Sequence, residues 1–219
     1  MKDENAMTMQ RSAKAEHTRE RILEVAGEEM RRVGYRAMGL NDILEKLRMS
    51  KGALYHHFRN KLELGYAVLD ELYTKSFLKV WVSPLERDDP LKAIINCLQA
   101  MSENMTADML SCGCPINNLA NEMSNLDEGF RLRVEGVFDR WKSRMTSAFR
   151  RAQKKGYMSR DVDAENTAVF VIATIQGAIT LAKSSQDASI FSQATQSASN
   201  YLKSLQTPVL KQSESPAVR

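Results

Sequence analysis

Apolar side chains recur at steps of three and four residues along almost the whole chain, and this repeat constrains the fold more than any other feature. One such stripe runs through Ile22, Val25, Ala26, Met30 and Val33. Steps of three and four place side chains on one face of an α-helix, whereas a half-buried strand needs a step of two. No stretch of useful length alternates with period two. The sequence therefore predicts an all-α protein.

Glycines, prolines and capping residues mark where the predicted helices end. In chain order we expect helices at about 17–33, 40–47, 51–58, 60–81, 91–105, from 115, 127–155, 163–183 and 188–206. The two ends of the chain are poor in core-forming residues and have no apolar repeat, so we expect them to be loose. The predicted organisation is a flexible N-terminus over 1–16, a small domain over 17–62, a larger helical domain over 63–206 and a flexible tail over 207–219.

The net charge is concentrated in the N-terminal part of the chain. Residues 1–61 carry 13 lysines and arginines against 9 aspartates and glutamates, whereas residues 62–219 carry 18 of each kind. All of the net charge of +4 therefore lies in the small domain. A basic domain beside a neutral one indicates a polyanionic partner such as nucleic acid.

The two short helices after position 40 have the pattern of a helix-turn-helix, in which a tight turn joins two short helices. Ser50 is well placed to cap the second one. Within that helix Leu54 and Phe58 are four residues apart and face the core, which leaves Tyr55 and His56 outside. A tyrosine hydroxyl and a histidine imidazole can bond phosphates or base edges.

The segment 18–64 resembles the DNA-binding domain of TetR-family transcriptional regulators. Its most specific part is SKGALYHHFRNKLEL at 50–64, where a serine, a small pair, an aromatic residue before histidine, a phenylalanine and a lysine have the family's spacing. The resemblance implies a homodimeric repressor that binds a palindromic operator in double-stranded DNA. It implies DNA-binding roles for Thr18, Asn41, Ser50, Lys51, Gly52, Ala53, Tyr55, His56 and Lys61. One departure is Arg48, which stands where the family has a glycine and is costly if the turn needs a positive φ.

The resemblance also implies that the larger domain senses a small molecule and forms the dimer. The apolar run 167–182 is shorter than the roughly 20 residues of a membrane helix and is interrupted by Gln176. We expect this helix to be buried in protein and covered by the last two helices of a second copy. The sequence starts with no recognisable signal peptide, and three cysteines make no disulfide framework, so we expect a cytoplasmic protein without a membrane partner.

Methionines and aromatic residues in the larger domain suggest an adaptable apolar pocket. Met101, Met105 and Met109 are four residues apart, which predicts a shared helix face. The pocket candidates are Met101, Met105, Met109, Phe138, Trp141 and Met145. Methionines at helical spacing are more often part of a plain core, and both interpretations are open at this point.

The stretch SCGCPINNLANE at 111–122 holds two of the three cysteines. All three histidines lie in the N-terminal third, so we expect neither a metal site nor a thiol enzyme, and no cofactor. A disulfide between Cys112 and Cys114 would close a small, strained ring. Pro115 places Cys114 at a helix start, where the helix dipole would lower the pKa of its thiol.

Cys114 is therefore either a reactive sensor or only the start of a helix. The stretch around it is similar to a branch of the TetR family that contains cysteine-based sensors of electrophiles and oxidants. The expected function is a repressor, not an enzyme, that leaves DNA when a small molecule binds or when Cys114 is modified. The alternatives are a purely reversible sensor of a small apolar ligand and, in another class, a thiol enzyme or a protein-interaction module.

Overall fold

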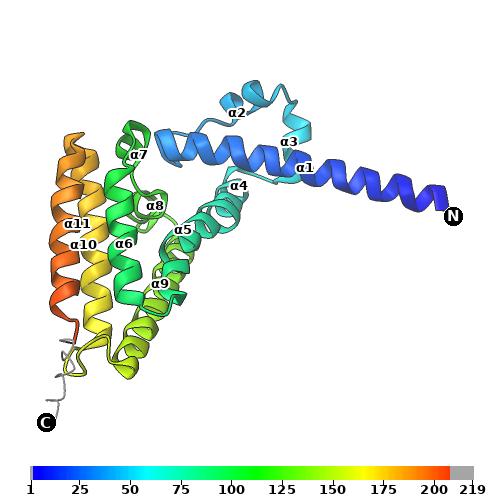
Figure 1. The fold of residues 1–219 in the computed structure, drawn as a ribbon. Coiled ribbons are helices and arrows are strands. Elements are labelled where there is room, and N and C mark those ends of the chain that lie inside the picture. The colour runs from blue at the N-terminus through cyan, green and yellow to red at the C-terminus, as the bar shows by residue number, and fades with distance from the viewer. Residues whose placement is uncertain (1, 208–219) are drawn as a thin grey trace, which may run out of the picture.

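The computed structural model describes residues 2–207, and this part of the chain is helical without a strand (Figure 1). The elements are α1 (Lys2–Val33), α2 (Leu40–Leu47), α3 (Lys51–His57), α4 (Lys61–Ala67), the π-helical segment η1 (Val68–Tyr73), α5 (Thr74–Trp81), the 3-10 turn η2 (Ser83–Glu86), α6 (Pro90–Glu103), α7 (Ala107–Cys112), α8 (Pro115–Met123), α9 (Glu128–Lys155), α10 (Ala164–Ser185) and α11 (Ala188–Ser204). The predicted all-α class is confirmed. Figure 1 shows α6, α10 and α11 side by side, with α1 crossing above the end of α4.

The first helix is longer than the sequence pattern indicates. It begins at Lys2 rather than at His17, and it extends away from the rest of the molecule (Figure 1). The expectation of a loose segment over 1–16 did not include a helix there, and the looseness itself stays a prediction. It rested on the missing apolar repeat, but the segment is rich in good helix formers and holds no glycine or proline to stop a helix. The flexible tail expected over 207–219 lies outside the described residues, apart from Thr207.

The turn between α2 and α3 does require a positive φ. Arg48 has φ 50° and ψ 45°, and its N–H donates to the carbonyl of Glu45 at 3.1 Å. A side chain with a Cβ is disfavoured in this left-handed region by about 1 kcal/mol or more, whereas glycine enters it freely. The departure from the family pattern at Arg48 thus introduces local strain into the turn.

Replacing Arg48 by glycine is expected to raise the free energy of unfolding by about 0.5–1 kcal/mol, because the left-handed strain in the folded state is relieved. The greater freedom of the unfolded chain with glycine offsets part of this gain. Urea denaturation followed by circular dichroism measures the change. Arg48→Ala is the matched control, since it removes the exposed guanidinium and keeps the Cβ. Equal stability of the glycine and alanine variants would contradict the strain argument.

One continuous helical stretch runs from Lys61 to Trp81, as expected, but its middle is π-helical. Asn60 caps it, because its Oδ1 accepts from the Glu63 N–H at 2.8 Å. A π-helical turn changes the direction of the side chains that follow it, and such turns are frequent at functional sites. Here the segment brings Leu72 and Tyr73 to the wall of the cavity described below.

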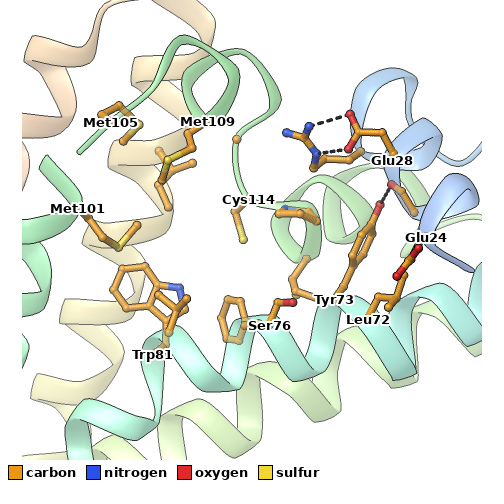
Figure 2. A pocket seen from close by; sticks show the side chains of 18 residues that line it. Glu24, Glu28, Leu72, Tyr73, Ser76, Trp81, Met101, Met105, Met109 and Cys114 are labelled. Carbon is orange, nitrogen blue, oxygen red and sulfur yellow. Dashed lines mark hydrogen bonds and ion pairs between the residues drawn. The ribbon is translucent and has the colours of Figure 1, made fainter. Parts of the chain in front are cut away.

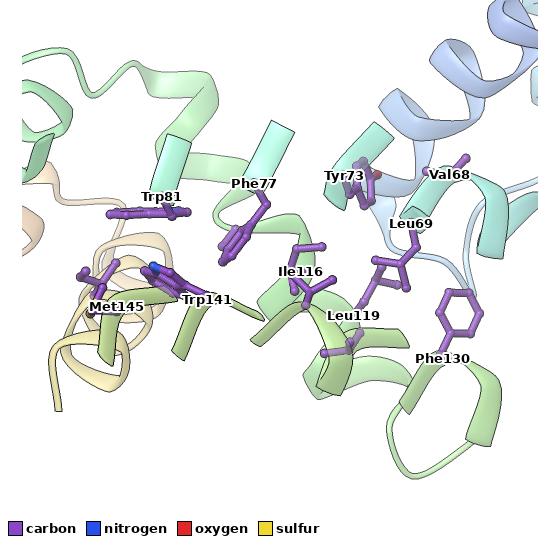
Figure 3. Packing of buried hydrophobic residues seen from close by; sticks show 14 of the residues in the cluster. Val68, Leu69, Tyr73, Phe77, Trp81, Ile116, Leu119, Phe130, Trp141 and Met145 are labelled. Atoms are coloured by element: carbon purple, nitrogen blue, oxygen red, sulfur yellow. The ribbon is translucent and has the colours of Figure 1, made fainter. Parts of the chain in front are cut away.

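Two aromatic groups hold the core together, and both are built on α9 (Figure 3). In the larger domain the ring of Trp141 packs against Phe77 and Trp81 of α5, with both centroid distances at 5.0 Å. In the second group Phe130 contacts Tyr35 at 4.7 Å and Tyr66 at 4.9 Å. Tyr35 follows α1, so this second group fixes the small domain on α4 and α9.

Helix α10 is 22 residues long, and by length and composition alone it could cross a membrane. It packs instead between α9 and α11, and its inward residues are buried. The outer face remains uncovered in the single chain, where Val169, Phe170 and Leu181 are exposed. Only one face of this helix is therefore buried within the chain.

Candidate DNA-binding surface and ligand cavity

The local structure of α3 follows from its capping and its apolar pair. Ser50 is the N-cap, and its Oγ accepts from the Ala53 N–H at 3.3 Å. Leu54 and Phe58 are buried against the small domain's core. Because these two side chains fix one face of α3, the opposite face is directed to solvent.

The exposed face of α3 carries the predicted reading residues Lys51, Gly52, Ala53, Tyr55 and His56. The Tyr55 side chain is exposed to 39%, and the Lys51 Nζ lies 5.9 Å from the centroid of its ring. A cationic group and a phenolic hydroxyl thus share one patch. Nothing from the rest of the described chain covers this patch, so a DNA groove could meet it directly.

Three further predicted DNA contacts are placed less openly. Asn41 is exposed at the start of α2, whereas Thr18 is partly buried on α1 and its hydroxyl donates to the Lys14 carbonyl at 2.8 Å. The Lys61 Nζ donates to the Arg36 carbonyl at 2.9 Å, and burial lowers the pKa of its ammonium. Lys61 therefore serves first as an internal link, and only its remaining N–H groups could bind a phosphate.

A second candidate site is a cavity of about 510 Å³ (Figure 2). It lies between α1 of the small domain and the helices of the larger domain. Its wall includes Met101, Met105 and Met109 together with Tyr73 and Trp81. The three methionines do not share one helix, because α6 ends at Glu103 and Thr106 caps a new helix that the apolar pattern did not reveal. All three methionines nevertheless line the same cavity. They are brought together by the packing of α6 and α7 and not by a shared helix face.

The other three predicted pocket residues do not line this cavity. Trp141 and Met145 are fully buried in the aromatic core, and Phe138 packs at its edge. Helix α5 lies between α9 and the cavity, so Phe77 and Trp81 form the wall in their place. These α9 residues thus lie outside the wall of this cavity, and their role in a ligand pocket stays a prediction. The sequence did not show which helix stands between α9 and the cavity.

Cys114 is the N-cap of α8 and lines the cavity, with its sulfur directed inward (Figure 2). Its side chain is nevertheless only 8% exposed, and burial raises the pKa of the thiol. The nearby Asn117 and Ile116 backbone N–H groups and the Gln176 side chain lower the pKa by less. The expectation of a lowered pKa is therefore wrong, because desolvation outweighs the helix start. The sensor role of Cys114 stays a prediction without this chemical support.

The polar residues after Cys114 hold this turn in place, a role that the sequence reading missed. The Asn118 Nδ2 donates to the Cys112 carbonyl at 2.7 Å, and the Asn118 Oδ1 accepts from the Lys183 Nζ at 3.2 Å. Asn117 donates to the Thr180 hydroxyl at 2.9 Å. The motif NNLANE thus ties the turn and α8 to α10.

Two polar contacts connect the cavity region with the DNA-binding domain. At the far end of α8 the Glu122 carboxylate accepts from the backbone N–H groups of Tyr35 at 3.0 Å and Arg36 at 2.8 Å. Arg31 of α1, which lines the cavity, pairs with Asp108 of α7 at 2.9 Å. The only sequence signal for Glu122 was its place on the polar face of α8, four residues after Asn118.

A helix-turn-helix with an exposed reading face, joined to a helical domain with a ligand-sized cavity, defines a DNA-binding transcriptional regulator. The chain belongs to the TetR family. Residues 22–68 match the model of the bacterial regulatory proteins of the tetR family, and residues 90–197 match the C-terminal domain of LmrA/YxaF-like transcriptional regulators. The family and the fold are those of transcription regulators and not of enzymes.

Individual relatives agree with this assignment. The transcriptional regulator AcuR of Cereibacter sphaeroides is 33% identical over 157 residues, which are 68% of this chain and 69% of AcuR. The transcriptional repressor DhaR of a Mycobacterium species is 30% identical over 149 residues, 67% of this chain and 72% of DhaR. The crystal structure of a regulatory protein TetR from Rhodobacter sphaeroides superimposes with a TM-score of 0.74 at 28% identity, covering 83% of this chain and 97% of the other. The narrower resemblance to cysteine-based sensors stays a prediction.

Proposed function

We propose that this protein is a cytoplasmic, homodimeric repressor that leaves a palindromic operator when a small apolar ligand occupies the cavity. The observation that carries the proposal is the composition of the cavity wall. Glu24, Gly27, Glu28 and Arg31 of α1 face the same space as residues of α6, α7 and α8. A bound ligand therefore contacts the DNA-binding domain and the larger domain at once.

Reversible binding accounts for the cavity better than covalent modification does. Methionine and aromatic side chains adapt to apolar ligands of varied shape. Burial raises the pKa of the Cys114 thiol and so disfavours the thiolate, which is the form that attacks an electrophile. In this proposal Cys114 is part of the wall that the ligand touches.

The link from the cavity to α3 runs through α8 and α7. Cys114, at the start of α8, touches the ligand, while Glu122, near its end, holds the backbone that follows α1. A ligand that binds one orientation of α8 more tightly than another shifts the population of the small domain's orientations. The Arg31 and Asp108 ion pair couples α7 to α1 in the same way.

The exposed face of α10 supports the dimer. Val169, Phe170 and Leu181 form an apolar stripe, and the small residues Ala173 and Gly177 lie between them. Small residues permit a close approach of a second helix, and a twofold pairing of α10 and α11 would bury the stripe. Such a dimer places two reading helices about 34–36 Å apart, which is one turn of DNA.

Replacing Leu181 by glutamate is expected to convert the protein to a monomer, because a charge would be buried within the pairing face. Leu181 is 59% exposed in the single chain, so the substitution costs the monomer little stability. Sedimentation velocity gives the oligomeric state, and operator affinity is expected to fall at least 100-fold in parallel. The control is Leu132→Glu, a similarly exposed leucine on α9. A dimeric Leu181→Glu variant would contradict this interface.

The function itself is tested by selecting chromosomal fragments on the purified protein and following release from the enriched fragment by fluorescence anisotropy. The expected result is a palindromic site and its release by apolar compounds that bind the cavity. Cys114→Ser is expected to retain that release within a few-fold. A different outcome would be that only a maleimide or hypochlorite releases the DNA, and that Cys114→Ser loses this response while Cys97→Ser keeps it. That result would contradict reversible ligand binding and would assign a thiol-sensor role to Cys114.

A further inference from the structure

Gln176 lies in the middle of α10 as a buried amide among apolar residues. Its side chain is 8% exposed, and Ile175 and Ala178 beside it are buried. Within residues 2–207 neither its Nε2 nor its Oε1 has a hydrogen-bond partner, and both atoms are inaccessible to solvent. One N–H donor pair and one carbonyl acceptor are thus unused in the interior.

An unused buried amide is costly to keep. Leaving such a donor or acceptor unpaired costs about 1–3 kcal/mol, and an apolar side chain of the same size avoids this cost. Packing alone gives no reason for glutamine at this position, because leucine or methionine would fill the space. The amide is therefore available to a partner from outside the chain.

The amide is also close to the cavity. It lies next to the Cys114 sulfur, where it helps to lower the pKa of the thiol against the effect of burial. Cys114 itself points into the cavity (Figure 2), and Ile179, three residues after Gln176 on α10, is part of the wall. Gln176 itself is not part of the cavity wall, but its amide lies beside the Cys114 thiol, which is.

The surroundings of Gln176 select for an uncharged partner. The ionised groups of the wall, Glu24, Glu28 and Arg31, all come from α1, at the opposite side of the cavity from the methionines and Trp81 (Figure 2). An ion beside Cys114 would lose its hydration without a countercharge. A hydroxyl or carbonyl group loses much less and can pair with either end of an amide.

We propose that Gln176 is a specificity-determining residue for the effector, which is an apolar molecule with one uncharged hydrogen-bonding group that enters beside Cys114 and bonds to the Gln176 amide. The inference rests on the proposed function and narrows its ligand class. The apolar body of the ligand lies against Met101, Met109 and Trp81, and the Cys114 side chain turns aside to admit the polar group.

The test compares the affinity of the full-length protein for 2-naphthol with its affinity for naphthalene. Binding is measured as quenching of the fluorescence of Trp81, which is one of the two tryptophans. The parent is expected to bind 2-naphthol about 10–100-fold more tightly than naphthalene, the usual value of a hydrogen bond to a buried group. In Gln176→Leu this preference is expected to vanish, because 2-naphthol weakens while naphthalene binding stays unchanged. The leucine variant is also expected to be at least as stable as the parent. 2-Acetylnaphthalene tests whether a carbonyl replaces the hydroxyl.

Gln176→Met makes the same comparison if the leucine variant fails to fold. A parent without preference for 2-naphthol, a preference that survives in Gln176→Leu, or no binding of either compound would each overturn the proposal. The operator assay separates this failure from that of the proposed function. If 2-naphthol binds through Gln176 but leaves operator affinity unchanged, the ligand-released repressor is wrong and the Gln176 assignment stands.

Discussion

Replacing Lys51 and Tyr55 together by alanine lowers specific operator affinity by an expected 100-fold or more. Both side chains lie on the exposed face of α3, within 5.9 Å of one another, and neither supports the core. A base or phosphate contact of this kind contributes about 1–3 kcal/mol, so the loss of two contacts reaches this magnitude. Leu54 and Phe58 are untouched, and the fold is expected to persist.

Fluorescence anisotropy over a series of salt concentrations measures the loss and divides it by cause. Lys51→Ala alone is expected to reduce the slope of log affinity against log salt by about two for the proposed dimer, since each copy loses one phosphate contact. Tyr55→Ala is expected to leave that slope unchanged. Lys154→Ala, an exposed lysine in the last turn of α9, is the control for general charge. Specific binding that survives the double substitution would remove α3 from the role of reading helix.

Glu122→Ala is expected to disconnect the cavity from the operator. The carboxylate accepts from two backbone N–H groups of the DNA-binding domain, and hydrogen bonds to charged groups contribute about 1.5–3 kcal/mol each. Their loss is expected to lower the free energy of unfolding by about 2 kcal/mol, because the Arg36 N–H is exposed and regains a water partner.

The substitution is also expected to reduce the effect of the ligand on operator binding. Ligand-induced weakening of operator binding, commonly 5–150-fold, is expected to fall below about twofold.

The measurement titrates ligand into the preformed complex of the variant with its operator, and separately into the free protein. Ligand affinity of the free protein is expected to stay within a few-fold of the parent. Glu122→Gln keeps one carbonyl acceptor and is expected to be intermediate. Glu135→Ala, an exposed α9 residue paired with Arg131, controls for loss of an acidic group. If the Glu122→Ala variant releases DNA like the parent, Glu122 does not couple the cavity to the operator-binding domain. The coupling would then be assigned to the ion pair of Arg31 and Asp108.

The features that the sequence predicted well are local ones. The Ser50 cap and the inward Leu54 and Phe58 depend on residues within a few positions of one another. Short-range sterics and hydrogen bonds decide these features, so a single stretch of sequence contains the required information. The same holds for Cys114 as the cap of α8.

The features that the sequence did not predict depend on distant parts of the chain. The pKa of Cys114 is set by burial under other helices, including α10, more than 60 positions away. Trp141 faces α5 and not the cavity, which only the packing of three helices decides. The partner of Glu122 lies 87 residues earlier. The helical repeat predicts which residues point inward, but it does not predict which residues of other helices they contact.

Helix α1 carries both Thr18, a predicted DNA contact, and Arg31, which lines the cavity, so its length sets the mechanical scale of the proposed induction. Thr18 and Arg31 are 13 positions apart, which corresponds to about 20 Å along a helix axis. If α1 moves as a stiff lever about its cavity end, a tilt of about 5° displaces Thr18 by about 2 Å over that distance. In a dimer the two levers move in opposite senses, so the separation of the reading helices changes by up to twice that amount. A mismatch of a few ångströms with the DNA repeat is enough to break register without any repacking inside the small domain.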